Sequence, residues 1–101
     1  MITFTIVTIT YNAAGCLSRT LDSVLRQTWP HVEHIIVDGA SSDDTVVIAE
    51  DYARRSAASG CGHRVLITSE PDRGLYDAMN KGLRRATGDY VLFLNAGDFF
   101  P

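Results

Sequence analysis

The sequence predicts an α/β fold in which a parallel sheet is covered by helices on both faces. Four short runs rich in β-branched or aromatic residues alternate with three segments in which apolar residues recur at helical spacing. The strand-like runs are continuously apolar, which is typical of parallel strands buried on both sides. With 101 residues, the chain is long enough for one domain and too short for two, so residues 1–101 are expected to form a single domain.

The first strand is predicted at residues 4–9 (FTIVTI), and the first helix at residues 16–27. Trp29-Pro30 is expected to end this helix, since proline cannot continue it. The apolar face of the helix, at spacings of four, three and one residues, consists of Leu17, Leu21, Val24 and Leu25.

The second strand is predicted at residues 32–37 (VEHIIV) and the second helix at about 45–57. Residues 41–44 (SSDD) supply N-cap candidates and negative charge at the start of this helix. Its expected inward positions are Val47, Ile48, Tyr52 and Ala53.

A third strand at residues 64–68, a third helix at 75–85 and a fourth strand at 90–94 complete the pattern. Right-handed crossovers are then expected to place one helix pair on each face of the sheet. Among the sheet orders that these rules permit, we choose 3-2-1-4 by analogy with known folds.

Composition restricts the partners. The net charge of −3 and the pI near 5.4 argue against nucleic acid as the main partner, which needs a basic surface. A nucleotide ligand stays compatible with this charge, because a divalent cation bridges carboxylate and diphosphate. Cys16 and Cys61 lack paired spacing, and no segment is long enough to span a membrane. We expect a cytoplasmic protein with free thiols, with peripheral attachment at the inner face of the membrane left open.

Polar residues follow each predicted strand, at the edge where open parallel sheets bind ligands. Acidic side chains are frequent among them, and they repel one another unless a cation or a hydrogen-bonding ligand relieves them. In chain order, the candidates are Thr10, Tyr11, Asn12, Asp38, Glu70, Asp72, Arg73, Asn95 and Asp98.

Four of these candidates admit two interpretations. Asp38, directly before Gly39, suits a turn or a carboxylate that accepts the imide N–H of a uracil. Tyr11 suits a rim aromatic or a base-stacking one. Asp98 suits an exposed acid or a ligand of Mg²⁺ or Mn²⁺. Arg73 suits a phosphate contact or an ion pair with Asp72.

Other features point away from further sites. Lys81, Arg84 and Arg85 are expected on the solvated face of the third helix. The turn after the first strand reads TYNAAG, so it contains neither the G-x-G-x-x-G fingerprint nor a P-loop.

Two long blocks carry a specific resemblance. The opening FTIVTITYNAAGCLSRTLDSVLRQTWPHVEHIIVDGASSDDT closely resembles the N-terminus of family 2 glycosyltransferases. The later stretch EPDRGLYDAMNKGLRRATGDYVLFLNAGDFF is similar to their colanic-acid-type branch, which makes bacterial surface polysaccharides. The resemblance covers essentially the whole chain. It implies the Rossmann-like N-terminal half of a GT-A fold, which binds a UDP-sugar or another nucleotide-sugar.

The same resemblance assigns roles. Tyr11 would flank the base, Asp38 would bind it, and Asp72 and Arg73 would lie near the base and phosphates. Thr10 and Asn12, beside Tyr11, are expected among the donor-binding residues. The family's metal motif, commonly D-A-D-D, falls on residues 95–98 (NAGD), where only the last acid is present. The resemblance therefore implies Asp98 as the ligand of Mn²⁺ or Mg²⁺, with Asn95 near the ribose.

The resemblance also implies an inverting sugar transfer to a glycan or lipid-linked acceptor. Family members continue past the metal motif into the acceptor region, which carries the catalytic base, so we expect a chain truncated after that motif and assign the base to no residue. Glu70 and Asp77 are acids of the right type without that role in the family. The alternatives are a non-catalytic nucleotide-sugar-binding fragment and, less favoured, a nucleotidyltransferase. Apolar surface around Phe93, Phe99 and Phe100 is expected to be exposed and to favour self-association.

Overall fold

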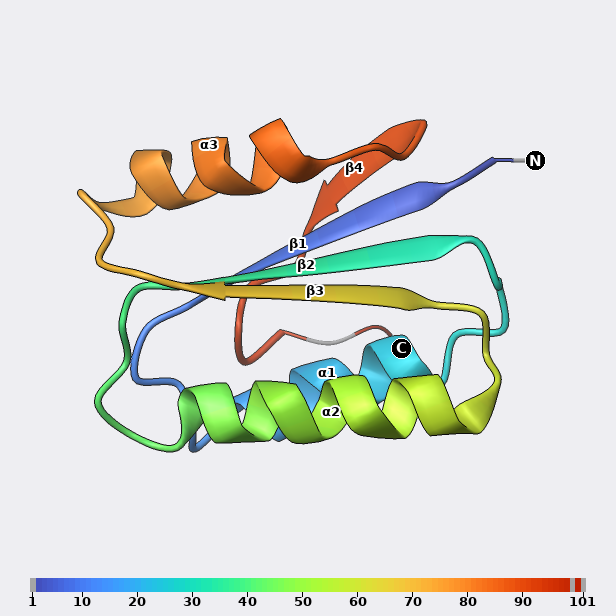
Figure 1. The fold of residues 1–101 in the computed structure, drawn as a ribbon, viewed down its shortest axis with the longest axis horizontal. Helices are drawn as coiled ribbons and strands as arrows, with labels where there is room; N and C mark the ends of the chain where they lie inside the picture. Colours follow the sequence, from blue (N-terminus) through green and yellow to red (C-terminus); the bar gives the residue numbers. More distant parts are fainter. Residues whose placement is uncertain (1, 99, 101) are drawn as a thin grey trace.

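The computed structural model describes residues 2–98 and Phe100, and it contains one four-stranded parallel sheet with three helices (Figure 1). The strand order is β3-β2-β1-β4, which confirms the predicted order. The elements in chain order are β1 (Phe4–Thr10), α1 (Leu17–Leu25), β2 (Val32–Asp38), α2 (Thr45–Ser59), β3 (Arg64–Ser69), α3 (Leu75–Arg85) and β4 (Tyr90–Phe93).

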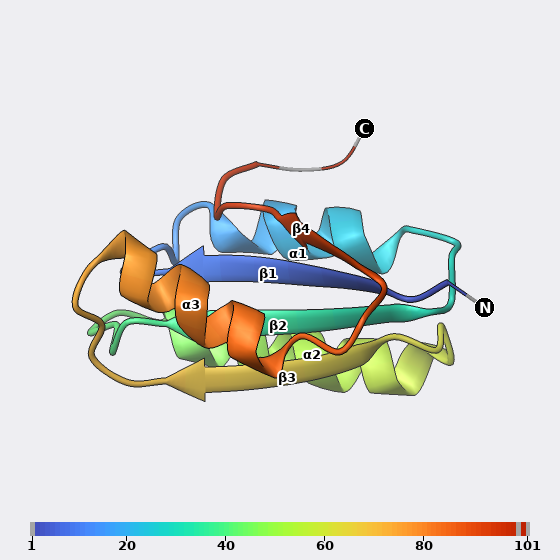
Figure 2. The ribbon, with the colours of Figure 1, turned by 90° about the horizontal axis from the view of Figure 1, so that it is seen from above.

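The two faces of the sheet are covered unequally. Helices α1 and α2 pack side by side on one face, and among the described helices α3 alone lies on the other (Figures 1 and 2). The expectation of one helix pair on each face was wrong. Only the β3-to-β4 connection crosses on the α3 side, because the strand order reverses there and the first two connections both run on the α1 side.

The register of the parallel strands aligns their carboxyl ends. Thr10 at the end of β1 lies opposite Asp38 at the end of β2, and Asp38 lies opposite Ser69 at the end of β3. β4 is shorter, since its pairing with β1 ends at Val7 and Phe93. Three polar side chains therefore meet at one point of the sheet edge.

The core between the sheet and the helix pair confirms the predicted face of α1. Leu17, Leu21 and Val24 are fully buried there. In α2 the inward face is set by Ala49 and Tyr52, whereas Val47 is 61% exposed and was assigned inward wrongly. Buried positions of α2 recur every three or four residues, at Thr45, Ala49, Tyr52 and Ser56.

On the other face, α3 approaches β1 very closely. Gly82 makes this approach possible, because a Cβ atom at this position would lie 2.5 Å from Cγ1 of Val7. Ala78, one turn earlier, is buried with Val7, Ile35 and Val37. The small residues of α3 therefore fix its distance from the sheet.

A buried histidine, His34, lies on the face of the sheet that α1 and α2 cover. The His34 imidazole on β2 is fully buried, with Nε2 2.8 Å from Thr8 Oγ1 and Nδ1 2.7 Å from the Tyr52 hydroxyl. Burial removes the hydration of an imidazolium, with a smaller contribution from His63, and lowers the pKa of His34 to about 3. The ring is therefore neutral at ordinary pH.

The edge strand β4 leaves apolar side chains in solvent. Phe93 is 40% exposed, as expected, while Phe100 is half-buried against the cluster that contains Ile6 and Val24. Phe99 lies outside the described residues. Within the described part of the chain, no helix combines the length and the apolar character needed to cross a bilayer.

Candidate functional site

A pocket of about 490 Å³ opens at the carboxyl ends of β1 and β2, on the α3 side of the sheet. Such a position, beside the point where the strand order reverses, is where open α/β sheets bind ligands. The lining residues are Ile9, Thr10, Tyr11, Gly39, Pro71, Asp72, Gly74, Leu75 and Ala78. Three connecting segments, after β1, β2 and β3, thus contribute to one cavity.

Gly39 lets the two functional walls of the pocket come together. A Cβ atom at this position would lie 3.0 Å from Oδ2 of Asp72 and 3.4 Å from Cδ1 of Tyr11. Tyr11 is 67% exposed, so the ring is accessible to a ligand. The pocket therefore presents an aromatic surface next to a carboxylate.

Asp38 sits below this surface, with only 1% of its area exposed. Its Oδ1 accepts hydrogen bonds from Thr10 Oγ1 (2.7 Å) and Ser41 Oγ (2.6 Å). Its Oδ2 accepts from the Ser41 amide (2.9 Å) and Ser69 Oγ (2.8 Å). Burial by itself raises the pKa of Asp38, but the hydrogen bonds, led by those from Ser41, outweigh it and hold the pKa below its ordinary value.

These contacts match the turn interpretation of Asp38. The carboxylate joins the ends of three strands and the start of the loop before α2, and among the described residues it is absent from the pocket lining. Contact between Asp38 and a base stays a prediction. The Thr10 hydroxyl donates its hydrogen bond to Asp38, and Thr10 is also one of the residues that line the pocket.

Asn12 joins the loop after β1 to the loop before α2 by hydrogen bonds. It adopts a positive φ of 48°, and its Oδ1 accepts a hydrogen bond from the Ser42 amide at 2.8 Å. Its own amide donates to Ser41 Oγ at 2.8 Å. Nearby, the Ala14 amide donates to Asp43, whose pKa is lowered chiefly by a hydrogen bond from Thr45. The loop beside Tyr11 is thus fixed against the loop before α2, and a direct role of Asn12 in donor binding stays a prediction.

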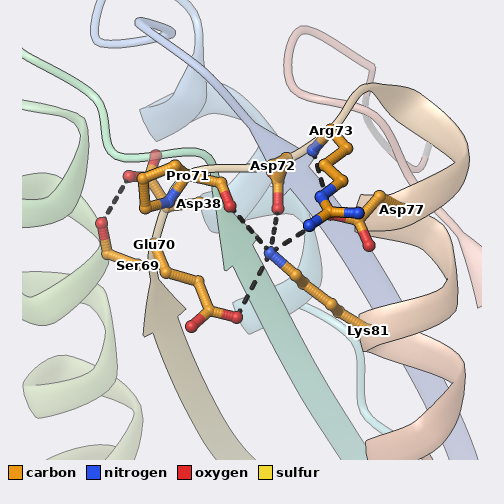
Figure 3. Close-up of polar contacts among 8 residues, drawn as sticks. All are labelled: Asp38, Ser69, Glu70, Pro71, Asp72, Arg73, Asp77 and Lys81. Atoms are coloured by element: carbon orange, nitrogen blue, oxygen red, sulfur yellow. Dashed lines mark hydrogen bonds and ion pairs between the residues drawn. The ribbon is translucent and has the colours of Figure 1, made fainter.

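Lys81 is the centre of an ion-pair cluster, and its expected place on a solvated helix face was wrong (Figure 3). Its ammonium donates to Asp72 Oδ1 at 2.6 Å and to the Pro71 carbonyl at 3.1 Å. Glu70 and Asp77 lie at 3.2 and 3.5 Å. These contacts, with the hydrogen bond to Asp72 first, raise the pKa of Lys81 to about 12.

The position of Lys81 on α3 explains the error. The loop before the helix folds back over this position, so only 14% of the side chain is exposed, whereas Arg84 and Arg85 are exposed as expected. Asp77, four residues earlier, was the available signal, because such pairs meet on one helix face. The repulsion expected among the acids of this edge is therefore relieved in part by a cation of the chain itself.

Arg73 does not pair with Asp72, whose described ion-pair partner is Lys81. Its amide donates to Asp77 Oδ2 at 2.9 Å, which is the leading cause of the lowered pKa of Asp77. The residue is exposed beside the pocket-lining residues Asp72 and Gly74.

The loop that carries Asn95 and Asp98 leaves β4 toward α1. The Gly97 amide donates to Thr20 Oγ1 at 2.8 Å, and the Phe100 amide donates to Ser23 Oγ at 3.1 Å. Both Asn95 and Asp98 are exposed, and neither is among the described residues that line the pocket. The structure thus places them on the opposite side of the sheet edge from α3.

A metal ion finds no preformed cluster of three ligands in the described part of the chain. In residues 2–98 and Phe100 no group of three or more His, Cys, Asp or Glu side chains is placed to hold one. A single exposed carboxylate such as Asp98 still fits Mg²⁺ or Mn²⁺, because these ions often take one or two carboxylates and complete their shell with phosphate oxygens and water.

The sheet order, the helices on both faces and the pocket at the switch point define a Rossmann-like α/β domain with one ligand-binding edge. The chain belongs to glycosyl transferase family 2, whose family model matches residues 5–101. It is 43% identical over 95 residues to the PGL/p-HBAD biosynthesis glycosyltransferase of Mycobacterium bovis, covering 94% of this chain and 35% of that protein. An uncharacterized glycosyltransferase of Mycobacterium tuberculosis is 40% identical over 100 residues, covering 97% and 35%.

Solved structures confirm the predicted GT-A N-terminal fold. TarS of S. aureus (residues 1–349) in complex with UDP-GlcNAc superposes with a TM-score of 0.81 at 28% identity, covering 97% of this chain and 27% of that chain. The mannosyltransferase PcManGT from Pyrobaculum calidifontis, in complex with GDP-Man and Mn²⁺, gives 0.82 at 31% identity, covering 99% and 29%. The chain spans about a third of the length of the curated relatives it matches. Membership of the colanic-acid-type branch stays a prediction.

Proposed function

We propose that this chain is the donor-binding part of a glycosyltransferase that transfers a sugar from a nucleotide-sugar, foremost a UDP-sugar, to a glycan or lipid-linked acceptor with inversion. The observation that carries the proposal is the pocket at the carboxyl ends of β1 and β2, with Tyr11 and Asp72 in its walls. The glycosyltransferase names of the relatives and the UDP-GlcNAc bound to TarS support it.

The pocket suits a nucleoside. Its volume of about 490 Å³ lies within the range of small-molecule sites. The exposed ring of Tyr11 offers a face on which a base can stack, and Asp72 offers an acceptor for a base N–H. The exposed guanidinium of Arg73, beside the pocket, is free to reach phosphate oxygens.

We assign Asp98 as the ligand of a divalent cation and place Asn95 near the ribose. Bound there together with diphosphate, Mn²⁺ or Mg²⁺ would act as a Lewis acid that stabilises the departing nucleoside diphosphate. The loop that holds Asp98 is fixed to α1 by the hydrogen bond from Gly97 to Thr20, which presents the carboxylate to solvent. The Mn²⁺ bound with GDP-Man in PcManGT supports this assignment.

The general base is assigned to no residue of this chain. Glu70 and Asp77 are both held by Lys81, which opposes a role in proton transfer. For location we propose the cytoplasm, which suits the free thiols of Cys16 and Cys61.

Calorimetric titration of UDP into the purified chain, with and without Mn²⁺, tests the proposal. We expect metal-dependent binding, weakened about tenfold or more in Asp72→Asn, since a hydrogen bond to a charged group contributes about 1.5–3 kcal/mol. Asp98→Ala should fold, and its binding of UDP should no longer depend on Mn²⁺. Asp51→Asn, on the exposed face of α2, is the matched control and should bind as the wild type does. A folded wild-type chain that binds no nucleotide contradicts the proposal.

A further inference from the structure

We propose that Lys81 is a positioning residue that makes the pocket selective for nucleobases carrying a ring N–H donor, because it fixes Asp72 with one oxygen turned toward the ligand. This inference rests on the proposed nucleotide-binding function and adds to it the class of base that the pocket selects. It concerns a residue that the sequence pattern placed on a solvated helix face.

Lys81 ties the wall of the pocket to α3. Its ammonium reaches three consecutive residues of the loop before the helix, Glu70, Pro71 and Asp72, at 3.2, 3.1 and 2.6 Å (Figure 3). The loop is also held at its two ends. At one end the Glu70 amide donates to the Asp38 carbonyl at 3.0 Å, and at the other the Arg73 amide donates to Asp77, which itself contacts Lys81. Among the described contacts, the one that holds the carboxylate of Asp72 itself is the hydrogen bond from Lys81.

The two oxygens of Asp72 have different surroundings. Oδ1 accepts the hydrogen bond from Lys81. Oδ2 lies 3.0 Å from the position that a Cβ atom would take on Gly39, on the side where Tyr11 stands. From residues 2–98 and Phe100, no donor reaches Oδ2, although the side chain is only 12% exposed. An acceptor with an unused lone pair thus faces the pocket beside an aromatic ring.

The other carboxylate at this edge is not available in the same way. Both oxygens of Asp38 accept two hydrogen bonds each, from Thr10, Ser41 and Ser69. Of the four acids at this edge, Asp72 lines the pocket, whereas Asp38, Glu70 and Asp98 do not. The free acceptor for a base is therefore on Asp72.

A fixed carboxylate oxygen discriminates between bases by hydrogen-bond polarity. Uracil presents N3–H and guanine presents N1–H, and both are donors. Cytosine and adenine carry a lone pair on the corresponding ring nitrogen, so the oxygen would face another acceptor and stay unpaired. Leaving a buried polar group of the site unpaired is an effective way to reject an isosteric ligand. Since uracil and cytosine have the same shape, UDP and CDP isolate this effect.

The test compares UDP and CDP binding by calorimetry in wild type, Lys81→Met, Asp72→Asn and the double variant. We expect wild type to bind UDP at least tenfold more tightly than CDP, and Lys81→Met to lose most of that ratio by weakening UDP about tenfold while changing CDP little. The double variant should match Asp72→Asn, because Lys81 acts through Asp72. Arg85→Met, the same change of charge on an exposed position of α3, should keep the wild-type ratio.

Lys81→Gln is the second variant in case Lys81→Met does not fold. Its side chain is uncharged and one atom shorter, so that its amide does not replace the ammonium at Glu70, Pro71 and Asp72, and the same loss of ratio is expected. Equal weakening of UDP and CDP, additive losses in the double variant, or an unchanged ratio would each overturn the role of Lys81 while leaving nucleotide binding intact. A folded wild type that binds neither nucleotide would overturn the proposed function and this inference with it.

Discussion

Lowering the pH should destabilise the fold through His34 at pH values above those at which the carboxylates of the chain become protonated. The pKa of His34 falls from an ordinary 6.5 to about 3 in the folded chain, because burial disfavours the imidazolium. When the pKa of a histidine is lower in the folded chain than in the unfolded chain, the fold has its full stability at pH values above the pKa of the unfolded chain. That stability is lost as the pH falls from 6.5 toward 3, since only the unfolded chain binds the proton in this interval.

The magnitude follows from the two pKa values. Each pH unit below 6.5 lowers the free energy of unfolding by about 1.4 kcal/mol, so the loss at about pH 5 is about 2 kcal/mol relative to about pH 7.5. Urea denaturation followed by circular dichroism at these two pH values measures it. Such a loss is a large part of the stability of a small domain.

The variant His34→Gln separates this effect from the other titrating groups. It should lower the free energy of unfolding at both pH values, because it disturbs the contacts with Thr8 and Tyr52, and it should abolish most of the difference between them. His31→Gln, at a half-buried position outside the core, should keep the difference. A wild type equally stable at both pH values, or a variant that retains the full difference, would refute the reasoning.

Other expected results concern packing, the strand ends and the exposed edge. Gly82→Ala should destabilise the chain by about 1–3 kcal/mol, since its Cβ would overlap Val7, whereas Gly15→Ala, with open space around it, should be tolerated; equal thermal midpoints would contradict this. Asp38→Asn should cost about 2 kcal/mol, because an amide cannot accept all four hydrogen bonds, and an unchanged urea midpoint would count against it. Phe93→Asp should reduce the self-association predicted for the exposed edge, and a concentration-independent monomer mass of the wild type in sedimentation would remove that prediction.

The positions of most helices and strands could be predicted from the sequence. The continuously apolar strands and the turn residues between them gave element positions close to those observed, and helix α3 was predicted with the bounds Leu75–Arg85. The inward face of α1 followed from spacing alone. The sheet order came from analogy, because the short crossovers of this pattern are compatible with several orders.

Tertiary contacts explain what the sequence could not give. Val47 and Ala49 differ in helical phase, and the small side chain is buried because α2 packs closely on the sheet and α1. The four hydrogen bonds of Asp38 depend on strand register, which no local pattern contains. Lys81 is covered by a loop that folds back over it.

The polar residues of the binding edge could be identified from the sequence, but the face of the sheet toward which each of them lies could not. The register and the loops make that assignment: Tyr11 and Asp72 face the pocket, while the loop of Asp98 turns toward α1. Only the path of each loop after its strand determines this side, and that path depends on contacts such as the one from Gly97 to Thr20.

A crystal structure of the chain with UDP and Mn²⁺ tests the central claim most directly. We expect the uracil ring against Tyr11, with its N3–H directed at Oδ2 of Asp72, and the metal ion on Asp98. A nucleotide bound away from this pocket, or a base that makes no contact with either Tyr11 or Asp72, would contradict it.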